Sequence, residues 1–183
     1  MLKPKQGRLL ISEPSLNNSI FFKSVILITH HNKEESIGLI LNHPTKIQLH
    51  QILNNIPLID LPVYIGGPVE KQSLHFIHTL GDVIPNSKNI SKNIYYGGDF
   101  EIIIQLMYEK KISKKEIRFF IGYSGWGIEQ LNNEIREDSW IVQKPNSNLC
   151  MNYSTSELWG DIIRDQKNRY AIWANMPKDP NLN

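Results

Sequence analysis

The segment Gly122–Trp126, read as G-Y-S-G-W, is the part of the chain most suggestive of catalysis. It follows an expected strand and precedes an expected helix, which is the setting of a nucleophile elbow, G-x-S-x-G. However, the second glycine of that motif would fall where the chain has Trp126, and no histidine follows His78 to act as the base in the usual chain order. A glycine-rich turn explains the segment more simply, and an esterase-like hydrolase using Ser124 is kept as the alternative hypothesis.

The six histidines are the residues best suited to hold a metal ion. His30 and His31 are adjacent at the end of an expected strand, and His75 and His78 are three residues apart on another. Because successive side chains of a strand point to opposite faces, neither pair shares one ion easily. The chain also has no H-E-x-x-H or C-x-x-C motif. We therefore expect neither a metal ion nor another cofactor, and interpret these residues as hydrogen-bonding histidines at strand ends.

Glycine and proline corners with polar neighbours indicate a contact surface instead. Gly66–Pro68 follows an apolar strand without the lysine of a P-loop, so a tight turn explains its glycines. Loops held on a rigid scaffold commonly carry recognition. Trp126, which lies between glycines, is the tryptophan that could be exposed to a partner. We expect a binding site on one rim of the sheet, formed by His31, Asn42, Gly66, Gly67, Tyr123 and Trp126.

The charge composition narrows the choice of partners. The 183 residues include 20 Lys and Arg against 18 Asp and Glu, a net charge of +2, which gives no reason to expect nucleic acid or an anionic membrane. The one basic cluster lies between 110 and 118 and is interleaved with glutamates, as expected for a solvated helix end. Direct contact with nucleic acid is therefore not expected, and the partner is an unknown small molecule or protein.

Several features of the chain place it in the cytoplasm. Its N-terminus has no apolar run of signal-peptide length, and no stretch reaches the roughly 18 apolar residues that span a bilayer. The single cysteine, Cys150, excludes an internal disulfide framework.

No linker divides the chain, so we expect one domain over 1–183, with a flexible tail at 177–183.

Apolar periodicity predicts an α+β fold, because the strands come in groups rather than alternating with helices. Strands are expected at 8–11, 24–30, 37–42, 63–65, 74–78 and 117–122, and a surface loop at 84–93. One helix should follow the N-cap Asp99 and end at Tyr108. Others are expected where Ile128, Leu131 and Ile135 share one face, after a capping box of Ser154 and Glu157, and more weakly at 49–56.

Four blocks of the sequence together resemble the YqgE/AlgH family of bacterial proteins. The first opens with G-R-L-L-I at Gly7, and the second joins H-N at His31 to G-L-I-L-N-x-P at Gly38. The third is G-G-P-V at Gly66 with a later I-H, and the fourth is G-Y-S-G-W at Gly122 with Q-L-x-x-E and a tryptophan after it. The resemblance covers about residues 7–141. Among the departures, Ser36 stands where alanine is usual and His43 where a basic residue is common.

The resemblance implies a bifurcated, mostly antiparallel sheet folded into a pseudo-barrel with helices outside. It implies no cofactor and no established catalytic residues. Members are often labelled putative transcriptional regulators, although no DNA-binding motif supports that label. Together with the candidate rim, it leads to our hypothesis of a non-enzymatic ligand- or protein-binding domain with a regulatory role.

Overall fold

The structure is a computed structural model, in which residues 2–14, 20–145, 147–151 and 157–165 are described. Its strands are β1 Leu9–Ser12, β2 Val25–His31, β3 Glu35–Ile40, β4 Pro44–Gln48, β5 Pro62–Ile65, β6 Val69–His78, β7 Lys88–Ser91, β8 Ile94–Tyr96, β9 Ile117–Gly127 and β10 Trp140–Gln143. Its helices are the 3-10 turn η1 Leu49–Gln51 and the α-helices α1 Phe100–Tyr108, α2 Ile128–Arg136, α3 Ser147–Met151 and α4 Leu158–Asp165.

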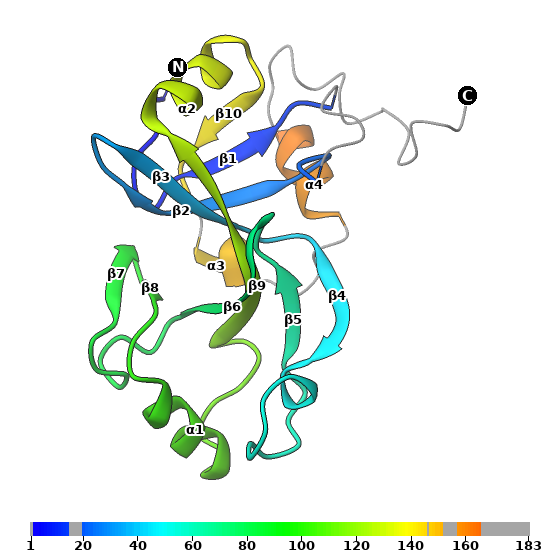
Figure 1. Cartoon of the computed structure of the whole chain (residues 1–183), viewed down its shortest axis with the longest axis vertical. Coiled ribbons are helices and arrows are strands. Elements are labelled where there is room, and N and C mark those ends of the chain that lie inside the picture. The colour runs from blue at the N-terminus through cyan, green and yellow to red at the C-terminus, as the bar shows by residue number, and fades with distance from the viewer. Residues whose placement is uncertain (1, 15–19, 146, 152–156, 166–183) are drawn as a thin grey trace.

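The ten strands form one forked sheet whose central strand is β9, as Figure 1 shows. The first half of β9 pairs with β5 in parallel on one edge and with β6 on the other. Its last residues leave β5 and pair with β3, which continues into β2, β1 and β10. Within the described residues the end strands β10 and β7 do not pair, so the sheet curves without closing. The expected α+β class and bifurcated sheet are confirmed.

Glycines make the fork possible. Gly122 has a φ of +66°, and a Cβ there would lie 2.7 Å from the carbonyl oxygen of Gly67. A Cβ on Gly66 would lie 2.2 Å from the carbonyl oxygen of Gly122, so the two chain segments approach more closely than any larger residue allows. The side chains on either side of Gly122 also meet different cores: Ile121 packs in one core, whereas Tyr123 packs in another.

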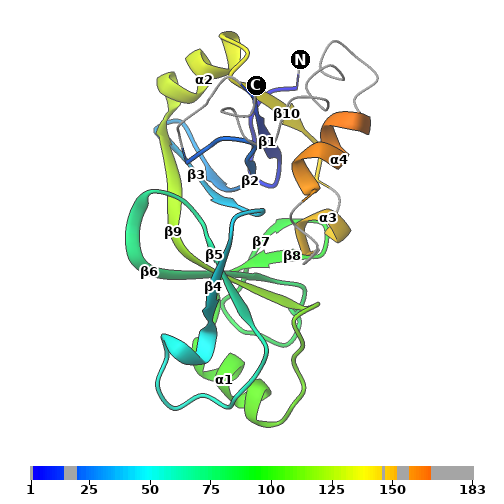
Figure 2. The same cartoon turned by 90° about the vertical axis from the view of Figure 1, so that its right-hand side faces the viewer.

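Three apolar cores lie against this sheet, and each includes residues of at least one helix. The first contains buried residues of α3 and α4, the second those of α1, and the third those of α2. Figures 1 and 2 show α2 and α1 at opposite ends of the molecule. Buried Arg118 ties α3 to the first core, since its guanidinium donates to the carbonyl oxygens of Cys150 and Leu41 and lies over the Tyr64 ring, 4.2 Å from its centre. This burial corrects the prediction that the basic cluster ending at Arg118 is wholly solvated.

Most of the expected elements are present, β4, β8, β10 and α3 were not expected, and three expected segments differ from the structure. The segment 84–93, expected to be a loop, contains β7. The weak helix at 49–56 is only the single turn η1, and no helix could extend to 56, since Asn55 adopts a φ of +61° and Pro57 restricts the residue before it. The expected glycine-rich turn after 122 is instead the last part of β9, which runs directly into α2. Ser154 and the tail 177–183 lie outside the described residues.

Candidate functional site

The six residues expected to form one rim are distributed over the molecule. Gly66 and Gly67 lie at the fork, where a Cβ on Gly67 would meet the backbone of Tyr123 at 2.2 Å, so the structure brings these three residues together. Asn42 lies beside the start of β2, at the opposite end of that strand from His31. Its side chain accepts a hydrogen bond from the Val25 amide and donates to the carbonyl of Lys23. There it holds the start of a strand, and its polar atoms are occupied.

Trp126 is buried, with 4% of its surface exposed, which corrects the expectation that it could face a partner. Its indole N–H donates to Oε2 of Glu134 at 2.9 Å, and the indole of Trp140 donates to the same oxygen at 2.7 Å. The carboxylate of Glu134 in α2 therefore fastens this helix to β9 and β10. Trp126 is a core residue whose polar atom is satisfied inside the protein.

Ser124 does not have the geometry of an activated nucleophile. Its side chain is fully buried, and Oγ donates to the carbonyl oxygen of Gly66 at 3.1 Å. Among the described residues no histidine hydrogen-bonds to this oxygen, although an adjacent base is what activates a serine. The hydroxyl instead stabilises the fork of the sheet.

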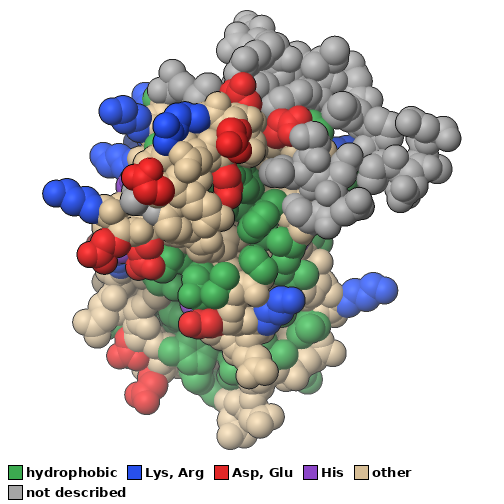
Figure 3. Space-filling model, turned by 45° about the horizontal axis from the view of Figure 1, so that its top comes forward, with side chains coloured by type: hydrophobic (Ala, Val, Ile, Leu, Met, Phe, Trp, Pro, Cys, Tyr) green, Lys and Arg blue, Asp and Glu red, His purple; other side chains and the backbone are tan. Residues whose placement is uncertain are grey.

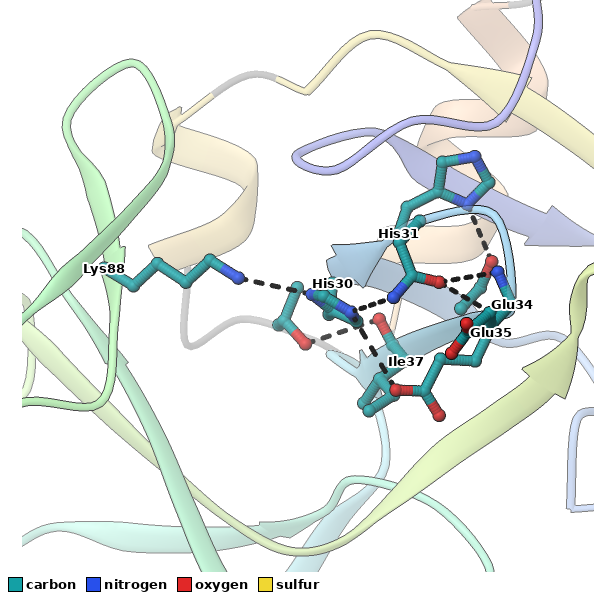
Figure 4. A network of polar contacts seen from close by, with 9 residues as sticks. His30, His31, Glu34, Glu35, Ile37 and Lys88 are labelled. Carbon is teal, nitrogen blue, oxygen red and sulfur yellow. Dashed lines mark hydrogen bonds and ion pairs between the residues drawn. The ribbon is translucent and has the colours of Figure 1, made fainter.

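His30 and His31 point to opposite faces of β2, as their adjacency on a strand predicts (Figure 4). Nδ1 of His30 lies 3.2 Å from the ammonium of Lys88 in β7, and Nε2 lies 3.8 Å from a carboxylate oxygen of Glu35. Nδ1 of His31 lies 2.8 Å from Oγ of the buried Ser36. His30 therefore joins β2 to the β7–β8 hairpin, and His31 faces the side of the sheet that α2 covers.

A cluster of three half-buried aromatic residues lies next to the fork, and we call His75, Tyr96 and Tyr123 the tyrosine–histidine cluster. Nδ1 of His75 lies 2.7 Å from the hydroxyl of Tyr96, and the two rings stack with centres 6.1 Å apart. The ring of Tyr123 meets that of His75 edge-on at 5.6 Å. The three residues come from β6, β8 and β9, so the sheet itself positions them.

Hydrogen bonds fix the orientation of the His75 ring. Oγ of Ser73 lies 2.8 Å from Nε2 and donates to the carbonyl oxygen of Glu70. Because that donation uses the only hydroxyl hydrogen of Ser73, the consistent assignment is that Nε2 carries the ring hydrogen and donates to Oγ. The hydroxyl of Tyr96 then donates to Nδ1. In this arrangement His75 does not act as a base toward Ser73.

Burial and nearby charges change the acidity of the cluster. Burial lowers the pKa of His75, so the ring is neutral at neutral pH. Burial, followed by the charges of Glu70 and Glu35, raises the pKa of Tyr123, and burial also raises that of Tyr96. The cluster thus offers uncharged hydroxyls and ring edges beside two carboxylates. An open cavity of about 580 Å³ is lined by residues 70–73, and its Ser73 is the residue that contacts His75.

Sequence reasoning identified Tyr123 but missed its partners. His75 was interpreted as a hydrogen-bonding histidine, which its bonds to Ser73 and Tyr96 agree with, but it was not assigned to the site. Tyr96 lies in a strand that the sequence did not predict. Tyr95 and Tyr96 next to Ile94 are a β-favouring run, which is the signal that could have indicated β8. The described residues contain no group of three or more His, Cys, Asp or Glu side chains able to hold a metal ion.

Basic side chains among the described residues lie close to acidic ones. Lys111 pairs with Glu109 at 2.8 Å, and Lys114 pairs with Asp60 at 2.6 Å. Figure 3 shows acidic and basic side chains interspersed on one face of the molecule. No helix within the described ranges is long and apolar enough to cross a membrane.

Comparison with known proteins places this fold and sequence in one family of compact α+β proteins. A family profile described as AlgH-like matches residues 9–171. A UPF0301 protein of Bacteroides fragilis is 38% identical over 181 residues, covering 98% of this chain and 92% of its own. A UPF0301 protein of Chlorobaculum parvum is 35% identical over 179 residues, covering 98% and 96%. The chain therefore belongs to the AlgH-like family.

Two solved structures share the fold. The crystal structure of protein DIP2367 from Corynebacterium diphtheriae superposes with a TM-score of 0.78 at 22% identity, covering 96% of this chain and 94% of that one. The solution structure of AlgH from Pseudomonas aeruginosa has a TM-score of 0.73 at 17% identity, covering 98% of each chain. At these identities the similarity shows the architecture.

Proposed function

We propose that this chain is a cytoplasmic binding domain with a regulatory role, which recognises a small molecule or a protein and catalyses no reaction. The observation that carries the proposal is the tyrosine–histidine cluster, half-buried at the fork of the sheet, which Ser73 connects to an open cavity lined by residues 70–73. Tyrosine combines a large apolar ring with a polar hydroxyl, which is why it is enriched at recognition surfaces.

The rigidity of the cluster supports recognition. Each of its residues comes from a strand, and hydrogen bonds on both sides of His75 hold its ring in one orientation. Such groups lose little conformational entropy when a partner binds. Tyr123 in addition has the charges of Glu35 and Glu70 nearby, which would favour a partner that carries hydrogen-bond donors or positive charge.

The competing functions have less support in the geometry. The buried hydroxyl of Ser124 is hydrogen-bonded to the backbone, which does not favour a hydrolase. Pairing of Lys111 and Lys114 with carboxylates leaves little of the basic footprint that DNA-binding surfaces have, so a regulatory role would be exerted through a contact other than DNA.

Native mass spectrometry of the chain purified from its own cells tests the proposal. We expect a retained molecule whose mass distinguishes a small ligand from a protein, and its loss in Tyr123→Ala. Tyr108→Ala is the matched control, because Tyr108 is an exposed tyrosine on α1. A wild-type chain that retains no molecule, or a Tyr123→Ala chain that retains as much of it as wild type, would contradict the proposal.

A further inference from the structure

A second cavity, of about 530 Å³, lies between the N-terminal segment and α2. It opens on the side of β2 to which His31 points, whereas the tyrosine–histidine cluster packs against the core on the side of His30. Its lining combines cationic, polar and apolar side chains: Leu2, Lys3, Pro4, His31, Asn132, Ile135 and Arg136.

The charges around this cavity have one sign. Lys3 and Arg136 are cationic, and the residues that line the cavity include no aspartate or glutamate. Arg136 is held in place, since Nη2 donates to Oδ1 of Asn133 at 2.6 Å and Nε donates to the carbonyl oxygen of Asn132 at 3.3 Å. The second bond is made to a carbonyl of α2 one turn before the end of the helix.

The cavity also has a fixed polar group and an apolar part. Nδ1 of His31 lies 2.8 Å from Oγ of Ser36, which orients the ring and leaves Nε2 for a ligand. Leu2, Pro4 and Ile135 supply apolar surface beside it. The guanidinium of Arg8 donates to the carbonyl oxygen of Lys3 at 2.6 Å, so the segment that forms one wall is attached to the sheet.

We propose that this cavity binds an organic carboxylate that carries an apolar body. The guanidinium of Arg136 matches the two oxygens of a carboxylate, and Lys3 adds a second positive charge. The apolar body would pack on Leu2 and Ile135. The same chemistry occurs in a free small carboxylate and at the C-terminus of a peptide that ends in an apolar residue, so the experiment includes both.

The test is an NMR titration of the ¹⁵N-labelled full chain with hexanoate. We expect shifts of the amides of Lys3, His31 and the end of α2, and an at least fivefold weaker dissociation constant in Arg136→Gln. Arg164→Gln is the matched control, because Arg164 is also an exposed arginine in the last turn of a helix. Equal affinity of Arg136→Gln and wild type would overturn the proposal.

Further titrations show whether the cavity prefers a free carboxylate or a peptide C-terminus, and which ligand groups it requires. Acetyl-Gly-Gly-Leu with a free carboxylate should bind more tightly than its C-terminal amide, and its affinity relative to hexanoate shows which source the cavity prefers. Inorganic phosphate or hexanol binding as tightly as hexanoate would overturn the proposal, because then the anion and the apolar body are not both recognised. Tyr123→Ala should leave hexanoate binding unchanged, so this test is independent of the proposed function.

Discussion

Several residues whose types suggested catalysis or ligand binding instead stabilise the fold. Ser124 is hydrogen-bonded to the backbone at the fork, and Trp126 is fastened to Glu134. The histidines behave in the same way, since most of their ring nitrogens have partners within the protein. His78 is the most buried of them, with no exposed surface. Polar residues in this protein therefore have to be judged by their partners before a function is assigned to them.

Protonation of His78 should destabilise the protein. Its Nδ1 accepts from the Leu80 amide, and Nε2 lies 2.9 Å from the carbonyl oxygen of Gly97. Burial lowers the pKa of His78 below the ordinary 6.5, although the bond to Gly97 opposes the shift. As the pH falls below 6.5, the unfolded chain therefore binds a proton at this residue before the folded chain does. The contribution of the neutral ring to stability is complete above that pH and decreases as the pH falls toward the lower pKa of the folded state.

We expect the midpoint temperature of thermal unfolding to decrease when the pH is lowered from about 7.5 to about 5.5, and to decrease less in His78→Gln. The ring of His78 in the folded wild type should titrate below 6.5 by NMR. A ring that titrates at or above that value, or an unchanged pH dependence in the variant, would show that His78 does not contribute.

At the scale of elements, the fork is the feature that positions everything else. Gly122 lets β9 change its partner from β5 to β3, and the next residue along the strand, Tyr123, reaches the cluster with His75. The helices are secondary to this arrangement, since each covers one of the cores that the sheet creates. The fold therefore depends on a few backbone positions more than on any helix.

Gly122→Ala should lower the free energy of unfolding by about 2 kcal/mol, since a left-handed conformation is costly for alanine and its Cβ would press on the Gly67 carbonyl. Gly127→Ala is the control, because Gly127 has a φ of −64° and nothing lies within 4 Å of a Cβ there. Urea denaturation of both variants measures the difference. Equal midpoints would mean that the fork tolerates a side chain.

The sequence predicted the long apolar strands and α1, whose patterns and N-cap are local signals. It did not predict β4, β7, β8 or β10. β4 and β7 are short and mostly polar, with one isoleucine each, and β8 and β10 are only three and four residues long. The turn at Gly66 was predicted, but its role at the fork was not, since that depends on the approach of Gly122 from a distant segment. Sites built by such long-range contacts leave little trace in a single sequence.

At the scale of the whole molecule, the protein has one cysteine, and it is fully buried in α3. Burial raises the pKa of the Cys150 thiol to about 12, against the smaller opposing effect of Arg118. Because the thiolate is the reactive form, the native protein should resist alkylation. Cys150 is therefore a natural reporter of whether α3 stays docked on the sheet.

We expect iodoacetamide at about pH 8 to label the native chain at least tenfold more slowly than the chain in urea, as followed by intact mass. Arg118→Met should speed native labelling, because it removes the bond from the guanidinium to the Cys150 carbonyl. Rapid labelling of the native wild type would mean that α3 opens readily. An unchanged rate in Arg118→Met would show that the arginine does not hold it.

The sharing of β9 between both branches of the sheet also has a consequence for biosynthesis. Three strands that bond to it, β3, β5 and β6, precede it in the chain, so they leave the ribosome before their common partner exists. During that interval their edges and apolar faces are open to other chains, which is the condition under which nascent proteins aggregate. A ribosome-bound chain that stops just short of Ile117 should therefore recruit holding chaperones, and one that extends past Gly127 should release them.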